Sequence, residues 1–256
     1  MGLSSLQPTQ RFSDRVDNYA RYRPTYPQAI IPYLRETIHL NRKHTIADIG
    51  SGTGIFTELF LKHGFRVTGV EPNEAMRLAG EAHLGNNHHF TSVDGKAEAT
   101  GLPAGSMDLI TVAQAFHWME PETTKAEFCR ILKEDGHILL VWNLRLTDTP
   151  FLKGLDDLKK DIGKNYEAIH GSHANEAVIR TFFSPAEVTI KTFRHAQIMD
   201  FESLKGQLLS SSYMPLEGAP GYTEMVERLE DLFQRYNENG QVNMEYDTRL
   251  FLGKGV

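Results

Sequence analysis

The segment from residue 45 to residue 54, Thr-Ile-Ala-Asp-Ile-Gly-Ser-Gly-Thr-Gly, constrains the fold more than any other stretch. A short run with β-branched residues ends in glycines, and the apolar residues that follow recur at helical spacing. This order predicts a strand, a tight turn and a helix, with glycines that permit positive φ and close approach of a ligand. Such a turn binds nucleotide-like ligands at the carboxyl end of a sheet.

Two acidic residues indicate which ligand suits this turn. No lysine follows Gly54, which excludes a P-loop, and the G-x-G-x-G spacing differs from the dinucleotide fingerprint G-x-G-x-x-G. Asp48 precedes the first glycine by two residues and would repel pyrophosphate, but it suits a cationic ligand such as S-adenosylmethionine. Glu71 follows the next apolar segment, about 20 residues beyond the turn, where an acid can accept hydrogen bonds from ribose hydroxyls.

Apolar runs and helical patterns alternate regularly through the first half of the chain, which predicts an α/β fold with a parallel sheet and helices on both faces. Expected strands are 45–49, 66–70, 89–93, 108–113, 137–142, 188–199 and 241–250, the last one antiparallel and half-exposed because its residues alternate cleanly. Expected helices are 12–22, one from 25 or 27 to about 40, 54–63, 73–83, 122–133, one through residues 152–158, 201–209 and one through residues 225–236.

Several motifs resemble the class I S-adenosylmethionine-dependent methyltransferases, most completely from about residue 45 to residue 143. Residues 48–54 resemble the first motif, 70–76 the second-strand motif, 95–98 with 102–103 the adenine-side loop, and 132–136 the turn before the fifth strand. Residues 107–118 are similar to the fourth strand of the type 11, ubiquinone-biosynthesis-like group, and 115–118 resemble trans-aconitate methyltransferase-like enzymes.

The resemblance implies a Rossmann-like, doubly wound, mostly parallel seven-stranded sheet with an antiparallel C-terminal strand and a helical lid. We expect one domain over residues 1–256, with a helical N-terminal cover (1–40), a cofactor-binding core (41–143), and lid helices with terminal strands (144–256). Residues 1–10 are polar and are expected to be mobile.

The same resemblance implies roles for individual residues. The expected cofactor-binding residues are Arg23, Asp48, Gly50, Ser51, Gly52, Thr53, Gly54, Glu71, Pro72, Met76, Ala97, Glu98 and Gln114. Lys96 stands where the family often has an aspartate and cannot accept a hydrogen bond from adenine, which leaves only its backbone. We expect His117 and Trp118 to be catalytic, although a satisfied histidine and a core tryptophan are the alternatives. Tyr19, Trp118, Trp142 and Tyr213 are the candidates for the acceptor pocket.

The composition of the chain limits the kinds of partner and compartment that suit it. A net charge of −6 argues against a nucleic-acid footprint, and one cysteine, Cys129, excludes an internal disulfide and suits a reducing compartment. The chain has no apolar run of membrane length and no signal-peptide pattern, so we expect a cytoplasmic protein that contacts neither membrane nor nucleic acid. The spacing of His83, His88 and His89 matches no metal-ligand motif, so no metal is expected. The oligomeric state stays open.

These observations favour a methyltransferase that uses S-adenosylmethionine, releases S-adenosylhomocysteine and acts on a small molecule. A carboxylic acid is the leading acceptor, since a carboxylate nucleophile needs no general base and no paired acid and base stands out near residues 108–113. The alternatives are N- or C-methylation of a small metabolite, a nicotinamide-dependent oxidoreductase, and a methyltransferase fold that only binds or regulates.

Overall fold

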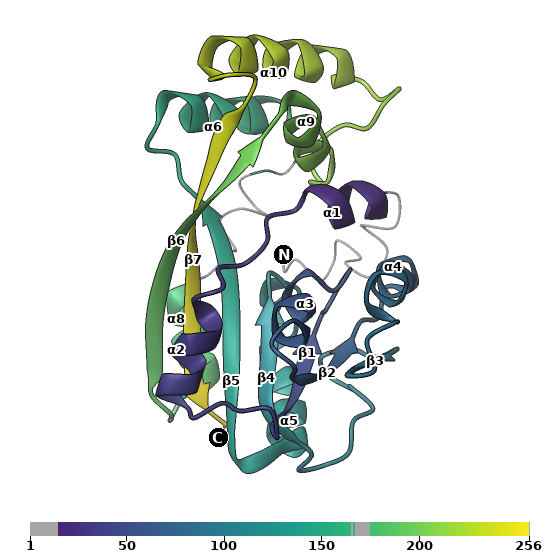
Figure 1. Cartoon of the computed structure of the whole chain (residues 1–256), viewed down its shortest axis with the longest axis vertical. Helices are drawn as coiled ribbons and strands as arrows, with labels where there is room; N and C mark the ends of the chain where they lie inside the picture. The colour runs from purple at the N-terminus through teal and green to yellow at the C-terminus, as the bar shows by residue number, and fades with distance from the viewer. Residues whose placement is uncertain (1–14, 165, 167–174, 256) are drawn as a thin grey trace.

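A computed structural model describes residues 15–164, 166 and 175–255 and has a seven-stranded sheet at its centre, in the order β3-β2-β1-β4-β5-β7-β6 (Figure 1). The strands are β1 (Thr45–Ile49), β2 (Arg66–Val70), β3 (Phe90–Val93), β4 (Met107–Ala113), β5 (Leu132–Arg145), β6 (Val188–Met199) and β7 (Val242–Lys254). Neighbours from β3 to β5 are parallel, whereas β7 runs antiparallel to both β5 and β6. The predicted doubly wound sheet with an antiparallel C-terminal strand is therefore confirmed.

Helices cover both faces of the sheet, because the central strands alternate apolar side chains between two hydrophobic clusters. Leu109 packs with the cluster that contains residues of α2, α3 and α4, whereas Ile110 packs with the cluster that contains residues of α5 and α8. The helices are α1 (Val16–Tyr22), α2 (Ile30–Thr37), α3 (Ile55–Leu61), α4 (Glu74–Leu84), α5 (Pro121–Ile131), α6 (Pro150–Ile162), α8 (Glu176–Phe183), α9 (Phe201–Leu209) and α10 (Tyr222–Tyr236), with a short 3₁₀ turn, η2 (Phe116–Trp118).

Side-chain caps fix where several helices begin. Asn73, Glu120 and Thr149 each accept a hydrogen bond from a backbone N–H in the first turn of the helix that follows. Pro121 and Pro150 occupy the first helical position, where the missing N–H costs nothing. The caps thus fix where α4, α5 and α6 begin, beyond the carboxyl ends of β2, β4 and β5.

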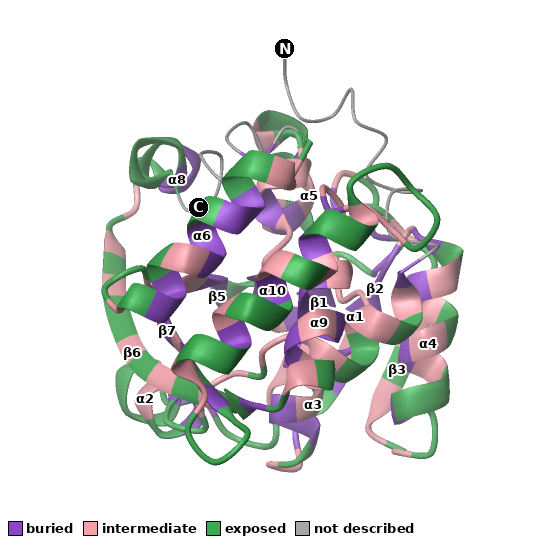
Figure 2. Cartoon of the chain, turned by 90° about the horizontal axis from the view of Figure 1, so that it is seen from above, coloured by how far each residue is buried: buried purple, intermediate pink, exposed green. Residues whose placement is uncertain are grey.

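A third hydrophobic cluster lies beyond the carboxyl ends of the parallel strands and joins α6, α9 and α10. We call these three helices the cap; they lie above the sheet in Figure 1. Figure 2 shows exposed residues on the outer surfaces of α6 and α10, as expected for helices that bury one face only. Helix α1 packs on α9, and the Arg15 guanidinium donates to the carbonyls of Leu209, Ser211 and Met214 at 2.7–2.8 Å.

The structure departs from the sequence expectations at three elements. Helix α8 was not predicted, and α2 spans only residues 30–37. Strand β5 begins at residue 132, because the expected turn at 132–136 is absorbed as an irregularity in its pairing with β4. The polar segment 1–10 lies outside the described residues. Among the helices that the structure describes, none is long and apolar enough to cross a membrane.

Candidate active site

The glycine turn after β1 is held against the neighbouring strand. The backbone N–H groups of Gly50 and Ser51 donate to the Val70 carbonyl at 2.8 and 3.2 Å. Gly50, Gly52 and Gly54 have φ values of +69°, +56° and +84°, a backbone region that residues other than glycine rarely adopt. The local sequence therefore folds as the motif predicts, with a left-handed turn that leads into α3.

The glycines serve different purposes. Among the described residues, a Cβ on Gly52 would meet only the Met76 methyl group, at 3.8 Å, so Gly52 presents bare backbone to a hollow. A Cβ on Gly54 would lie 2.4 Å from Leu84 of α4. Gly54 does not line the cavities found among the described residues, so its place in the structure corresponds to close packing of α3 on α4 instead of ligand contact.

Glu71 lies at the end of β2 and ties the turn to the start of α4. One carboxylate oxygen accepts the Gly52 N–H at 2.9 Å, and the other accepts the Asn73 N–H at 2.8 Å. Burial raises the pKa of Glu71, and the two backbone hydrogen bonds oppose that shift. Because a carboxylate has about four acceptor sites, Glu71 retains capacity for ligand hydroxyl groups.

Asp48 is buried beneath the turn at 1% exposure. Its two oxygens accept hydrogen bonds from the hydroxyls of Thr57, at 2.6 Å, and Thr111, at 2.8 Å. Burial raises the pKa of Asp48 from 3.8 to about 6, and both hydroxyl contacts oppose this shift. Both donors are neutral, so a positive charge near this carboxylate would stabilise its ionised form.

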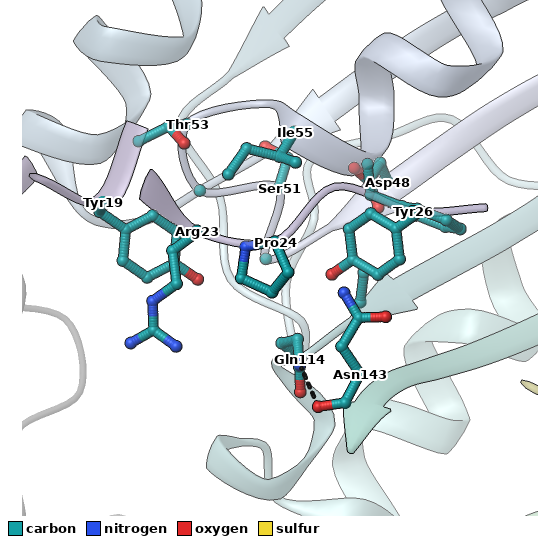
Figure 3. A pocket seen from close by; sticks show the side chains of 14 residues that line it. Tyr19, Arg23, Pro24, Tyr26, Asp48, Ser51, Thr53, Ile55, Gln114 and Asn143 are labelled. Atoms are coloured by element: carbon teal, nitrogen blue, oxygen red, sulfur yellow. Dashed lines mark hydrogen bonds between the residues drawn. The ribbon is translucent and has the colours of Figure 1, made fainter. Parts of the chain in front are cut away.

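Three adjoining cavities surround the strand ends, and all three share Tyr19 and Gln114. Gln114 follows β4 with φ of +57°, an uncommon conformation for a residue with a side chain. Its Nε2 donates to the Asn143 carbonyl at 3.1 Å, which fixes the side chain between the cavities (Figure 3). Backbone strain of this kind clusters at functional sites.

The first cavity, which we call the turn cavity, brings together most of the predicted cofactor residues. Lys96 joins this lining, and its backbone forms a pair of hydrogen bonds with Ala99 at 3.1 and 3.2 Å. Glu98 accepts the Glu120 N–H at 3.0 Å and thereby connects the 95–98 loop to the start of α5. The predicted residues that line the turn cavity are Gly50, Gly52, Glu71, Pro72, Met76, Ala97, Glu98, Gln114, Tyr19 and Trp118.

The remaining predicted cofactor residues, apart from Gly54, lie around the second cavity, the Asp48 cavity. Arg23 stacks over the Tyr19 ring, with its guanidinium carbon 4.7 Å from the ring centre, and its Nη2 donates to the Ser210 carbonyl at 3.1 Å. Thr53 is 2% exposed. Figure 3 shows Arg23, Asp48, Ser51 and Thr53 around this hollow together with Tyr26, whose pKa burial raises strongly.

The third cavity, the cap cavity, lies between the cap and the strand ends. His117 and Trp118 reach it from η2, and Tyr213 reaches it from the segment after α9. Sequence analysis missed several of its lining residues: Asn143, Arg145, Lys159, Gln207 and Tyr246. Lys159 could have been noticed in the sequence, because it directly follows Leu158 on the mostly apolar side of α6. A lysine in a helix with many polar residues is, however, usually interpreted as solvent-exposed.

Trp142 corrects a prediction. Its indole is 1% exposed and lies between Phe116 and Phe251, with ring centres 6.3 and 5.7 Å away. Because neighbouring strand residues face opposite sides of the sheet, Trp142 faces the core while Asn143 lines the cavities. Trp142 is therefore a core residue and not part of the acceptor pocket.

Comparison with known proteins agrees with this geometry. A family model described as a methyltransferase domain matches residues 47–140, the segment that holds the glycine turn, Glu71, Gln114 and Trp118. Residues 47–140 are therefore similar to a methyltransferase domain. We refer to this segment below as the methyltransferase domain.

Relatives of the methyltransferase domain occur in distant organisms. The chain is 34% identical over 145 residues to an uncharacterized methyltransferase of Mycobacterium tuberculosis, an alignment that covers 57% of each protein. It is 29% identical over 152 residues to an uncharacterized methyltransferase of Schizosaccharomyces pombe, covering 57% of this chain and 58% of the relative. The matches thus span somewhat more than half the length of these curated relatives.

A solved structure resembles nearly the whole chain. The "putative type II methyltransferase" of Anaeromyxobacter dehalogenans aligns over 91% of this chain and 97% of its own, with a TM-score of 0.64 and 22% identity. At that identity the likeness concerns the fold, which includes the seven-stranded sheet with its one antiparallel strand.

Proposed function

We propose that the protein transfers a methyl group from S-adenosylmethionine to a small carboxylic acid and so forms a methyl ester. The observation that carries the first half is the Gly52–Glu71 contact: a left-handed glycine turn whose N–H is held by an acid at the end of the next strand, open to the turn cavity. That arrangement presents bare backbone and a carboxylate side by side, as a ribose-bearing ligand without phosphates requires.

The residues present fit the cofactor. The Thr53 hydroxyl is buried without a hydrogen-bond partner among the residues that the structure describes, and it lines the Asp48 cavity. A ligand polar group there would satisfy it. Asp48 supplies the negative charge for an ammonium group, Glu71 holds ribose hydroxyls, and Met76, with Ala97 and the Lys96 backbone, borders the adenine.

When bound, S-adenosylmethionine supplies a methyl group on a positively charged sulfur that a nucleophile can displace. The chain has to align the nucleophile and exclude water, which together account for most of the acceleration such a reaction needs. Gln114, fixed by Asn143, and Trp118 lie where the turn cavity meets the cap cavity. Trp118 and His117 orient the acceptor there, and a carboxylate acceptor needs no proton removed.

Calorimetric titration of the full chain with S-adenosylmethionine, S-adenosylhomocysteine and NAD tests the cofactor. We expect both adenosyl ligands to bind and NAD to bind weakly or not at all. A screen of small acids, amines and phenols with labelled donor then tests the acceptor. An ester product is cleaved by mild alkali to methanol, whereas a base-stable N-methyl or C-methyl product would refute the carboxylate assignment and leave the cofactor assignment standing.

A further inference from the structure

The cap cavity is more positively charged than a chain of net charge −6 suggests. Arg23, Arg145 and Lys159 line it, and no carboxylate belongs to its lining within the part of the chain that the structure describes. Arg23 directly follows α1, Arg145 ends β5, and Lys159 belongs to α6. Three elements far apart in the sequence therefore place cations around one hollow.

Several hydrogen-bond donors in this group are buried without acceptors. Lys159 is 3% exposed, and its amino group has no hydrogen bond or ion pair with any described residue. The Nε atoms of Arg23 and Arg145 are likewise buried without a hydrogen-bond partner among those residues. Native proteins satisfy almost all buried donors, so two unsatisfied Nε atoms beside a buried lysine at one cavity indicate a bound group that accepts hydrogen bonds.

Asp156, the acid paired with Arg145, does not neutralise the whole group. Asp156 accepts a hydrogen bond from Arg145 Nη2 at 2.9 Å and lies 2.9 Å from Lys160 Nζ. One carboxylate thus already serves two cations. Among the residues that the structure describes, Arg23 donates a hydrogen bond only to a neutral carbonyl, that of Ser210, and neither Arg23 nor Lys159 forms an ion pair.

We propose that Lys159 is the central residue of an anion-binding subsite, completed by Arg145 and Arg23, that holds a carboxylate or phosphate group of the methyl acceptor. This inference rests on the proposed function, because it assigns a specificity-determining residue to the acceptor side of the same site. Lys159 binds this group of the acceptor and takes no part in the transfer itself, since Gln114 and Trp118 border the turn cavity and Lys159 does not.

An anion bound at this subsite would also shift the pKa of Lys159. Burial lowers the pKa of Lys159, the nearby Arg145 and Arg23 lower it further, and Asp156 opposes them. The other titratable side chains that line the cavity are Tyr19, His117, Tyr213 and Tyr246. A bound anion favours the charged amine and so opposes the lowering of its pKa.

Calorimetric titration of the full chain, saturated with S-adenosylhomocysteine, with succinate and separately with inorganic phosphate tests the subsite. The two probes distinguish carboxylate from phosphate recognition. The test variant is Lys159→Met, which nearly keeps the length of the side chain and removes its amino group. Lys153→Met is the matched control, because Lys153 is an exposed lysine of the same helix.

We expect wild type and Lys153→Met to bind at least one probe, and Lys159→Met to bind it at least tenfold more weakly. S-adenosylhomocysteine should bind all three proteins equally. The proposal is wrong if neither probe binds wild type at millimolar concentration, or if Lys159→Met binds as wild type does. Probe binding by wild type is measured without any variant, so its absence overturns the proposal even if Lys159→Met fails to fold. Loss of S-adenosylhomocysteine binding by wild type would instead refute the proposed function.

Discussion

At the residue scale, the glycine turn combines two requirements that the sequence alone cannot separate. Gly52 and Gly54 both need a left-handed backbone, but only Gly52 opens onto a cavity, whereas Gly54 is closed off by Leu84. The motif therefore predicts the turn and its conformation correctly. Which glycine faces a ligand depends on how α4 packs against the turn, and that packing is a tertiary contact.

Gly52→Ala tests this division of roles. Its Cβ fits beside Met76 but occupies the space that a bound cofactor requires. We expect a stability loss of about 1–2 kcal/mol from the left-handed backbone and a much weaker affinity for S-adenosylhomocysteine, measured by urea unfolding and by calorimetry.

Gly105→Ala is the matched control for backbone strain. Gly105 has φ of +59° against +56° for Gly52, and its Cβ would meet nothing within 4 Å. It lies outside the three cavities, so this variant should lose similar stability and keep wild-type affinity. Equal affinity in both variants would show that Gly52 does not face the cofactor.

Asp48 makes a pH-dependent contribution to the free energy of unfolding, with a sign opposite to that of a carboxylate whose pKa is lowered on folding. Its folded pKa of about 6 exceeds the ordinary 3.8, so the folded protein binds more protons than the unfolded chain between these values. Its contribution to the free energy of unfolding therefore falls as the pH rises from about 4 to about 6. The size is on the order of 2–3 kcal/mol, given roughly 1.4 kcal/mol for each pKa unit.

Asp48→Asn removes this titration and keeps the shape of the side chain. Urea unfolding between pH 4 and pH 7 should show the stability of wild type falling relative to the variant up to about pH 6, then a constant difference. Because a cationic ligand favours ionised Asp48, wild-type affinity for S-adenosylmethionine should rise over the same range. A parallel rise in Asp48→Asn would mean that another group titrates.

At the scale of elements, the sequence predicts best where local pattern and burial agree. β1 and β2 match their predicted bounds to the residue, because central parallel strands are buried on both faces and read as short apolar runs. β5 extends beyond its expected end because Asn143 and Arg145 pair with Thr248 and Tyr246 of β7, about a hundred residues later in the chain. No local pattern contains that information.

Helix α8 was missed although its sequence carries the usual signals. Asn175 accepts hydrogen bonds from the N–H groups of Ala177 and Val178, and Ile179, Phe182 and Phe183 form one buried face. Because the helix is only eight residues long, its apolar periodicity covers few residues. The polar stretch before it adds no further apolar positions. A cap followed by apolar residues at spacings of three and four would have identified it.

The contact between α1 and α9 gives a prediction at this scale. A Cβ on Gly206 would lie 2.1 Å from the Tyr22 ring, so α1 can dock only because α9 has a glycine there. We propose that these segments form a cover over the cavities, which Tyr19 and Arg23 line. Gly206→Ala should displace Tyr22 and accelerate hydrogen exchange across residues 16–22.

Gly154→Ala is the control for a glycine replaced at a helix contact. Its Cβ would lie 2.6 Å from Leu232, so the change acts between α6 and α10, away from α1. Exchange in α1 should match wild type in this variant. The same acceleration in both variants, or in neither, would contradict a specific role for the α1–α9 contact.

At the scale of the whole molecule, the cavities lie where two packing units meet. The strand ends and the glycine turn belong to the sheet with its two flanking clusters, whereas α6, α9 and α10 pack around a cluster of their own. The turn could be predicted because its motif is contiguous. The cationic lining of the cap cavity could not, because Arg23, Arg145 and Lys159 meet only when the cap folds back over the sheet.

This arrangement predicts that the cap can be loosened without loss of cofactor binding. Leu229 is fully buried in the cap cluster, and Leu252 is 3% exposed in a cluster that flanks the sheet. Either leucine replaced by alanine should cost about 2–5 kcal/mol locally. Leu229→Ala should accelerate hydrogen exchange in α6 and α10 and weaken succinate binding. Affinity for S-adenosylhomocysteine should stay at the wild-type value, because no cap residue is found among the described residues that line the turn cavity. Leu252→Ala should instead accelerate exchange in β5 and β7.

If Leu229→Ala lowered affinity for S-adenosylhomocysteine as much as for succinate, the cap and the cofactor site would form one cooperative unit, and the division into a cofactor-binding core and a lid would be wrong.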